Sequence, residues 1–404
     1  MLRFKVLVRR FLSRFSSLDI LARHCYVIYK SMIYRYKYFR SEVIEDRFIF
    51  ESFGGASIAD SPYYLYLELR KKHPKATFIW VAKDLKSVDF KLLDKNVQLV
   101  KYKSKEYFQG YATASYWIVN CRLPFEIVKK KGQVYIQTWH GTPLKKLAND
   151  LSTSNNAISS LGAHKFSYKL EANRLDFFLS PSKYATDRFC SSFQLQSDKI
   201  LELGYPRNDL LYSKRRDEGY INELKQKLSI PLNKKVILYA PTWRDNKYDS
   251  ESMTHIHTNL LECEEFLSDF KDTIFLYRGH YFTKTENAMN AFIDVSEHNL
   301  VNDLLLISDC LITDYSSIFF DYALLYRPIY FYMPDLEEYS NATRGFYLDV
   351  EKDLPGTISR SISELKTEIK SGRYNETTLK EFNVTYNPYE DGKSSIRVID
   401  NLGV

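Results

Sequence analysis

The sequence lacks the short motifs that mark many nucleotide-binding and metal-binding sites. It contains no Gly-x-Gly-x-x-Gly fingerprint and no Walker phosphate loop. Its five cysteines are scattered and form no Cys-x-x-Cys pair, which argues against a disulfide framework and a cysteine-ligated zinc site and is typical of a cytoplasmic protein. His255 and His257 form a His-x-His pair without a third ligand at matching spacing. We therefore expect no metal and no cofactor.

Long uncharged runs are also missing. Arg23, His24 and Lys30 interrupt the longest apolar stretch, which falls short of the roughly 18–20 residues that a membrane-spanning helix needs. The start of the chain has neither the apolar core nor the small-residue cleavage site of a signal peptide.

Positive charge is concentrated at one end of the chain. Residues 1–40 contain ten Lys and Arg residues and one acidic residue, Asp19, so the net charge of this segment is +9. The net charge of the whole chain is +7, so the remainder carries −2. A nearly neutral remainder argues against nucleic-acid binding. Apolar residues at helical spacing alternate with the basic ones in residues 2–15, which predicts a basic amphipathic helix on an anionic membrane surface. The alternative is a helix packed on the protein with its basic face in solvent.

Beyond this arm, short apolar runs alternate with helical patterns, which predicts parallel sheets. The 404 residues suit two domains, and we predict a GT-B-like α/β fold, in which two Rossmann-like domains face each other across a cleft. We place the arm at 1–40, the first domain at 41–212 and the second at 213–404. The expected strands are 48–51, 77–82, 116–120, 134–138, 177–180, 201–203, 236–239, 274–277, 310–313 and 329–332.

Polar and basic residues follow several of these strands, at the sheet edge where ligands bind. Ser316 and Ser317 lie between a strand and the next helical pattern, so free N–H groups, hydroxyls and the helix dipole would favour a pyrophosphate there. The alternative is helix capping without a ligand. Three more residues follow neighbouring strands and could contact phosphate oxygens: Thr242, Arg244 and Arg278. The two arginines could instead form ion pairs with Asp245 or Asp314.

One histidine ends a strand in each predicted domain, namely His140 and His280. An imidazole with a near-neutral pKa can take a proton from an attacking hydroxyl, although a lone histidine is more often structural. The residues after His140 predict a tight turn and positive potential. We assign four residues to the acceptor side of the cleft: Gly141, Thr142, Lys145 and Arg207.

Several blocks of this sequence resemble the CDP-glycerol glycerophosphotransferases, which prime and polymerise teichoic acids. The main blocks are Gln137-Thr138-Trp139-His140-Gly141-Thr142-Pro143-Leu144-Lys145, Gly204-Tyr205-Pro206-Arg207-Asn208-Asp209, Ala240-Pro241-Thr242-Trp243-Arg244, Ser308-Asp309-Cys310-Leu311-Ile312-Thr313-Asp314-Tyr315-Ser316-Ser317, Phe320-Asp321-Tyr322 and Arg344-Gly345-Phe346-Tyr347. Weaker matches lie at 50–52, 60–62, 120–124 and 391–392. The resemblance covers residues 48–400. Ala148 and Tyr281 stand where the family usually has Gly and Pro, which leaves the subfamily open.

The resemblance implies a GT-B-like fold, peripheral attachment to the cytoplasmic side of the cell membrane, and a CDP-glycerol donor bound by the second domain. It links His140 and His280 to catalysis. It links Thr313, Ser316 and Ser317 to binding of the donor phosphates. We add Asp314 and Arg344, which also lie in matching blocks, to the expected donor site.

We therefore expect a transferase that moves glycerol phosphate from CDP-glycerol to a hydroxyl of a lipid-linked saccharide or polyol-phosphate acceptor and releases CMP. His140 is the expected general base, with His280 as the alternative. The donor could instead be CDP-ribitol and the product a capsule polymer. A GT-B sugar-nucleotide glycosyltransferase and a non-catalytic membrane scaffold are further alternatives. The acceptor, the number of units added and the oligomeric state do not follow from the sequence.

Overall fold

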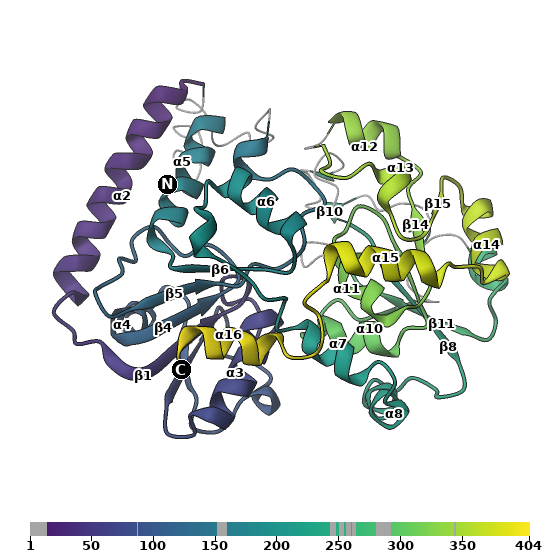
Figure 1. The fold of residues 1–404 in the computed structure, drawn as a ribbon, viewed down its shortest axis with the longest axis horizontal. Coiled ribbons are helices and arrows are strands. Elements are labelled where there is room, and N and C mark those ends of the chain that lie inside the picture. The colour runs from purple at the N-terminus through teal and green to yellow at the C-terminus, as the bar shows by residue number, and fades with distance from the viewer. Residues whose placement is uncertain are drawn as a thin grey trace. The chain divides into compact units, whose positions relative to one another are not determined.

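The chain folds into two compact units, shown in Figure 1. The computed structural model describes residues 14–86, 88–151, 160–242, 248–249, 254–255, 260, 264–279, 292–342 and 345–404. Unit 1 comprises Met1–His140, Lys146–Arg207 and Lys393–Val404, and unit 2 comprises Gly141–Lys145 and Asn208–Gly392. The chain thus changes unit at Arg207, ahead of the boundary predicted at 212, and its last segment returns to unit 1.

Unit 1 is built on a seven-stranded sheet in the order β3-β2-β1-β4-β5-β6-β7, and every pair of neighbours is parallel. Its central strands are rich in Phe, Ile, Val and Trp and are buried on both faces, as parallel strands covered by helices must be. The strands are β1 (Ile44–Glu51), β2 (Thr77–Ala82), β3 (Gln98–Lys101), β4 (Ala114–Val119), β5 (Val134–Gln137), β6 (Phe177–Ser180) and β7 (Ile200–Glu202).

Helices cover this sheet, and three of them, α4, α5 and α6, begin at a side-chain cap. Ser104, Ser160 and Ser182 each accept a hydrogen bond from a backbone N–H of the first turn that follows. The helices of unit 1 are α2 (Ser16–Tyr38), α3 (Asp60–Lys72), α4 (Lys105–Thr113), α5 (Leu161–Arg174), α6 (Lys183–Phe193) and α16 (Ser394–Leu402). Helix α16 belongs to this unit because it packs against α3, as Figure 1 shows.

Helix α2 forms most of the described part of the predicted arm; residues 1–13 lie outside the described residues. It packs against α5 and α4 of unit 1. Tyr34 and Tyr38 are buried in the core, and the Asp19 carboxylate accepts from the backbone N–H of Ser160 at 2.8 Å. No helix in the described ranges is long and apolar enough to cross a membrane.

Unit 2 contains a six-stranded, wholly parallel sheet in the order β12-β11-β8-β13-β14-β15. Its strands are β8 (Lys235–Ala240), β11 (Thr273–Tyr277), β12 (Phe292–Asp294), β13 (Cys310–Thr313), β14 (Ile329–Tyr332) and β15 (Thr357–Ser359). A separate antiparallel pair consists of β9 (Tyr248–Asp249) and β10 (Thr254–His255). The helices are α7 (Asn208–Lys214), α8 (Glu218–Lys227), α9 (Glu264–Ser268), α10 (Val301–Ile307), α11 (Ile318–Tyr322), α12 (Leu336–Ala342), α13 (Val350–Asp353), α14 (Ile362–Ser371) and α15 (Glu376–Tyr386).

The sheets confirm the predicted α/β class and all ten predicted strands. The strands that the sequence pattern missed in these sheets are β3, β12 and β15, and each lies at a sheet edge. These three edge strands are short and partly exposed, so they carry no continuous apolar run that a sequence pattern could reveal, whereas the edge strand β7 was predicted. Since all strands of each sheet run the same way, their carboxyl ends share one edge of that sheet, where the candidate functional residues collect.

Candidate active site

His140 lies just beyond the carboxyl end of β5 in unit 1, beside the ends of β4 and β1. Its Nδ1 atom is 2.7 Å from the carbonyl oxygen of Asn120, which directly follows β4. A carbonyl oxygen can only accept a hydrogen bond, so Nδ1 carries the proton. In the neutral ring the lone pair therefore lies on Nε2. This is the tautomer in which Nε2 can act as a general base.

The backbone and an aromatic neighbour also fix the His140 ring. Trp139 has a positive φ of 54°, an unusual conformation for a bulky residue, and it turns the chain sharply after β5. The Trp139 and His140 rings stack with centroids 4.2 Å apart, and Phe53 lies on the ring at 5.9 Å. The imidazole is therefore held in one orientation from several directions.

The surroundings of His140 favour its neutral form. Although the residue is exposed to solvent, the protein atoms around it displace part of its water, and this desolvation lowers its pKa. The hydrogen bond to Asn120 and the negative charge of Asp60 act in the opposite direction, and the positive charge of Arg207 lowers the pKa further. The net effect is a pKa below the usual value, so the ring can accept a proton at neutral pH.

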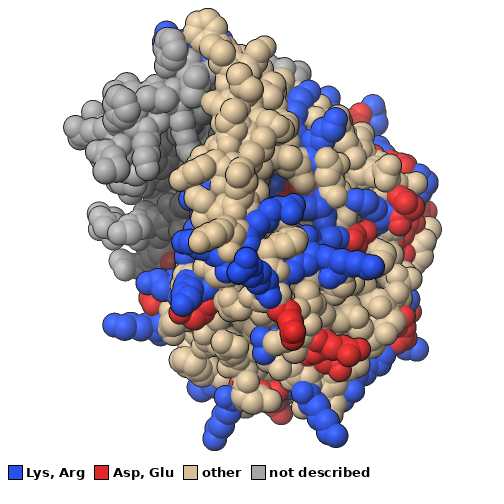
Figure 2. Space-filling view, turned by 90° about the vertical axis from the view of Figure 1, so that its left-hand side faces the viewer, with Lys and Arg blue, Asp and Glu red and all other residues tan. Residues whose placement is uncertain are grey.

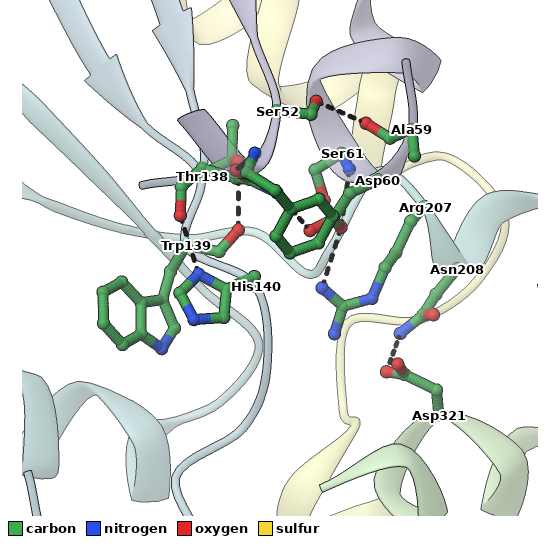
Figure 3. A network of polar contacts seen from close by, with 12 residues as sticks. Ser52, Ala59, Asp60, Ser61, Thr138, Trp139, His140, Arg207, Asn208 and Asp321 are labelled. Carbon is green, nitrogen blue, oxygen red and sulfur yellow. Dashed lines mark hydrogen bonds and ion pairs between the residues drawn. The ribbon is translucent and has the colours of Figure 1, made fainter. Parts of the chain in front are cut away.

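A buried polar network lies next to His140 (Figure 3). The Asp60 carboxylate accepts from Asn120 Nδ2 at 2.7 Å, from the Ser61 backbone N–H at 2.7 Å and from Arg207 Nη1 at 2.9 Å. Asp60 and Arg207 form an ion pair whose side chains are 6% and 4% exposed. The predicted acceptor residue Arg207 is thus a buried partner of Asp60.

The residues that follow His140 belong to unit 2. Gly141 approaches Ser317 so closely that a Cβ atom on the glycine would lie 2.7 Å from Ser317 Oγ. The Thr142 hydroxyl is buried and has no hydrogen-bond partner in the described part of the chain. Lys145 donates to the Tyr339 hydroxyl at 3.2 Å. Gly141 and Thr142 therefore lie in unit 2, with Gly141 beside the predicted donor residue Ser317, and their assignment to the acceptor stays a prediction.

At the sheet edge of unit 2, two predicted donor residues hold the strand ends together. The Thr313 hydroxyl donates to the carbonyl of Ala240 at 2.7 Å, and the Asp314 carboxylate accepts from the backbone N–H of Thr242 at 2.7 Å. Both Thr313 and Asp314 are buried. They fix the ends of β13 and β8 relative to each other, which sets the position of the serines that follow.

Helix α11 begins at Ile318, directly after the two serines. Ser316 Oγ accepts a long hydrogen bond of 3.4 Å from the Ile318 N–H, whereas Ser317, at the N-cap position, makes no side-chain cap bond. The Ser317 hydroxyl points instead toward Gly141, as the close approach shows. Ser317 is therefore available for a ligand in a way that a capping serine is not.

Arg278 is engaged with the backbone. Its Nη1 donates to the carbonyls of Val295 at 3.1 Å and His298 at 2.8 Å. Desolvation lowers its pKa to about 10, opposed by the nearby charge of Asp294. The guanidinium thus anchors the segment after β12. Three other predicted site residues lie outside the described residues: Arg244, His280 and Arg344.

Sequence reasoning assigned no role to Asp60 or Asn120, although both contact the residues around His140. Asn120 carried one usable signal, since it is the last residue of the predicted strand 116–120. Asp60 begins helix α3 and has a positive φ of 60°, which no sequence pattern reveals. Its proximity to Asn120 and Arg207 results from the chain fold.

Comparison with known proteins places the chain in a family. The family described as CDP-Glycerol:Poly(glycerophosphate) glycerophosphotransferase matches residues 32–403. The teichoic acid poly(glycerol phosphate) polymerase of Staphylococcus epidermidis is 41% identical over 80% of this chain and 45% of that protein, so this chain spans about half of its length. The teichoic acid glycerol-phosphate transferase of Staphylococcus aureus is 39% identical over 87% of this chain and 92% of that protein.

A solved structure of the wall teichoic acid polymerase TagF superposes with a TM-score of 0.85 at 35% identity, covering 98% of this chain and 97% of that chain. This likeness confirms the predicted GT-B-like fold. The match of the family over residues 32–403 confirms the resemblance that the sequence blocks indicated. The chain belongs to the CDP-glycerol:poly(glycerophosphate) glycerophosphotransferase family.

Proposed function

We propose that the chain transfers glycerol phosphate from CDP-glycerol to a hydroxyl of a membrane-linked acceptor in teichoic acid synthesis and releases CMP. Family membership supports the reaction class. The observation that carries the mechanism is the hydrogen bond from His140 Nδ1 to the carbonyl of Asn120, because it leaves Nε2 as the basic nitrogen.

In the proposed step the acceptor oxygen forms a bond to the β-phosphorus of CDP-glycerol. The bond from that phosphorus to the oxygen bridging to the α-phosphate breaks, and CMP leaves with the bridging oxygen. Nε2 of His140 takes the proton of the acceptor hydroxyl. Phosphoryl transfer of this kind depends mainly on alignment and on stabilisation of charge.

We assign the donor phosphates to the sheet edge of unit 2. Ser316 and Ser317 would supply hydroxyl and backbone donors, and Ser317 is the better placed because its hydroxyl does not cap α11. Thr313 and Asp314 act by holding the strand ends in place. Arg278 stabilises a neighbouring loop and has at most one side of its guanidinium left for a phosphate. Arg244, His280 and Arg344 remain proposals on sequence grounds.

Replacing His140 by alanine tests the role of the base. General-base catalysis contributes about 10²–10⁴-fold, so we expect turnover to fall by at least about a hundredfold. CMP release is measured with CDP-glycerol and a lipid-linked acceptor. A matched variant, His140→Asn, keeps an N–H that can reach the Asn120 carbonyl but has no basic nitrogen, and it should be as slow. If His140→Ala keeps more than about a tenth of wild-type turnover, His140 is not the base.

The same assay distinguishes the alternatives. CDP-glycerol, CDP-ribitol and UDP-sugars are offered separately, and release of CMP or UDP is followed. CMP release from CDP-glycerol supports the proposal, whereas preferential use of CDP-ribitol identifies a ribitolphosphotransferase. UDP release identifies a glycosyltransferase, and no release from any donor favours a non-catalytic scaffold.

We further propose that α2 attaches the protein to the cytoplasmic face of the cell membrane. One stripe of this helix is exposed and largely apolar, at the helical spacing of Leu18, Leu21, Cys25, Tyr29, Met32 and Tyr36. Figure 2 looks onto this side of the molecule and shows a column of uncharged residues with Lys and Arg beside and below it. Apolar side chains flanked by basic ones suit insertion among anionic headgroups.

Sedimentation with phosphatidylglycerol vesicles tests the attachment. The double variant Tyr29→Ser and Met32→Ser removes two side chains that are 62% and 63% exposed, so it should weaken binding without disturbing the core. Val384→Ser in α15, where the residue is 75% exposed, is the matched control and should bind as wild type. Equal sedimentation of all three proteins would contradict a role of α2.

A further inference from the structure

The orientation of the His140 ring depends on where the Asn120 carbonyl lies. That carbonyl is the hydrogen-bond acceptor of Nδ1, at 2.7 Å. The other titratable group close to the ring is the Cys121 thiol, whose sulfur lies 3.9 Å from Nδ1. Burial raises the pKa of Cys121 to about 12, so this thiol is neutral. Because the Asn120 carbonyl holds Nδ1, any movement of Asn120 would change the direction in which Nε2, the basic nitrogen, points.

Asn120 is fully buried, and its side chain is held at both ends. The backbone N–H of Phe53 donates to Asn120 Oδ1 at 2.7 Å, and Asn120 Nδ2 donates to Asp60 Oδ2 at 2.7 Å. The amide orientation follows from chemistry, because an N–H can only donate and a carboxylate can only accept. The Asn120 backbone N–H also donates to the carbonyl of Glu51 at 3.3 Å.

Asp60 is the residue that closes this arrangement. Its second oxygen, Oδ1, accepts from the Ser61 N–H and from Arg207 Nη1, so both carboxylate oxygens are in use. Figure 3 shows Asp60 between Arg207 and the residues around His140. Asp60 is the first residue of α3 and has a positive φ of 60°. Asp60, Asn120 and Arg207 all belong to unit 1, as does His140.

We propose that Asp60 is a positioning residue for the reaction: through Asn120 it holds His140 in the orientation and tautomer that the base requires. The expected effect on kcat rests on the proposed function. The effect of Asp60 on the orientation of the His140 ring does not depend on that function. Arg207 balances the Asp60 charge, so the pair positions His140 without placing a net charge beside it.

An asparagine at position 60 cannot replace the carboxylate. Its amide has one accepting oxygen and one donating nitrogen, so it would face either Asn120 Nδ2 or the Ser61 N–H with a second donor. For Asp60→Asn we expect kcat to fall about 10- to 100-fold with little change in KM for CDP-glycerol, since small displacements of catalytic groups cost rates of that order.

The titration of His140 reports the charges of the pair, and the rate reports the position of the ring, so the two are measured separately. Asp60 raises the pKa of His140 and Arg207 lowers it. Asp60→Asn should therefore move the titration to lower pH and Arg207→Gln to higher pH, while the double variant should titrate near wild type. The titration is followed by NMR of histidine-labelled protein, and His140→Asn identifies the His140 signals. It needs no substrate, so it stands even if wild type releases no CMP and the proposed function fails.

The double variant also guards against misfolding, because it leaves no unpaired buried charge. It should remain slow although its His140 titrates normally, since the amide at position 60 still cannot accept from both Asn120 Nδ2 and the Ser61 N–H. Asp94→Asn is the matched control: Asp94 pairs with Arg70 at 2.8 Å on the surface of unit 1, and its loss should change neither rate nor titration. The proposal is overturned if Asp60→Asn keeps wild-type kcat, or if His140 titrates as in wild type in both single variants.

Discussion

Replacing Gly141 by alanine tests whether the loop after His140 fixes the Ser317 hydroxyl. The new Cβ atom would lie 2.7 Å from Ser317 Oγ and 3.6 Å from Ser317 Cβ. Overpacking of this kind costs about 1–3 kcal/mol, and the lower entropy of the unfolded chain returns about 0.4–1 kcal/mol. The net loss of unfolding free energy is then between about 0 and 2.5 kcal/mol, measured by urea denaturation.

Gly141→Ala should also have a functional consequence, separate from this loss of stability. Ser317 can relieve the clash by rotating its hydroxyl, which no cap bond holds in place. A hydrogen bond to a charged group contributes about 1.5–3 kcal/mol, so a rotated Ser317 should raise KM for CDP-glycerol about 10- to 100-fold. Steady-state CMP release at saturating acceptor gives this KM.

Three further variants test the link between Gly141 and Ser317. Ser317→Ala should raise KM by a similar factor, and combining it with Gly141→Ala should add little, because both changes remove the same contact. Gly219→Ala in α8 is the control, since its Cβ would meet no atom closer than 3.5 Å, at Asp217 Oδ1. An unchanged KM in Gly141→Ala, or effects that add fully in the double variant, would refute the link between Gly141 and Ser317.

Two other predictions follow from the surroundings of His140. Because desolvation lowers the pKa of His140 and the base must be neutral, kcat/KM should fall only when the pH drops below the usual imidazole value of about 6.5. An acid limb at or above that value, or one that persists in His140→Asn, would contradict the assignment. Arg207→Met leaves the buried Asp60 carboxylate unpaired and should lower the unfolding free energy by about 3–5 kcal/mol. Arg70→Met breaks the exposed pair with Asp94 and should cost about 0–1 kcal/mol, so equal losses in urea denaturation would argue against the burial of Asp60.

The core strands were predictable because each is a buried apolar run. Strands such as β2 and β13 have almost every residue buried. A run of residues such as Val, Ile, Leu and Phe predicts a buried strand without information from the rest of the chain. The edge strands β3, β12 and β15 were not predictable, since half-exposed positions accept polar residues as readily as apolar ones.

The placement of His140 was predictable for a related reason. In a parallel sheet the carboxyl ends of all strands share an edge, so a histidine that follows a strand must lie at that edge. The same rule placed Thr313, Asp314, Ser316 and Ser317 together in unit 2. It did not reveal that Thr313 and Asp314 are used to join strand ends, because this depends on hydrogen bonds to Ala240 and Thr242 far away in sequence.

The sequence by itself determined the α/β class, the parallel sheets, the family and the position of His140 at a strand end, because local apolar patterns and ordered motifs carry that information. Only the tertiary structure decided that the Asn120 carbonyl accepts a hydrogen bond from His140 Nδ1. The same holds for the buried ion pair of Asp60 and Arg207 next to Asn120. These residues are separated by 20 to 147 positions along the chain, and no spacing rule brings them together. Their contacts exist because strands and helices from distant segments end at the same sheet edge.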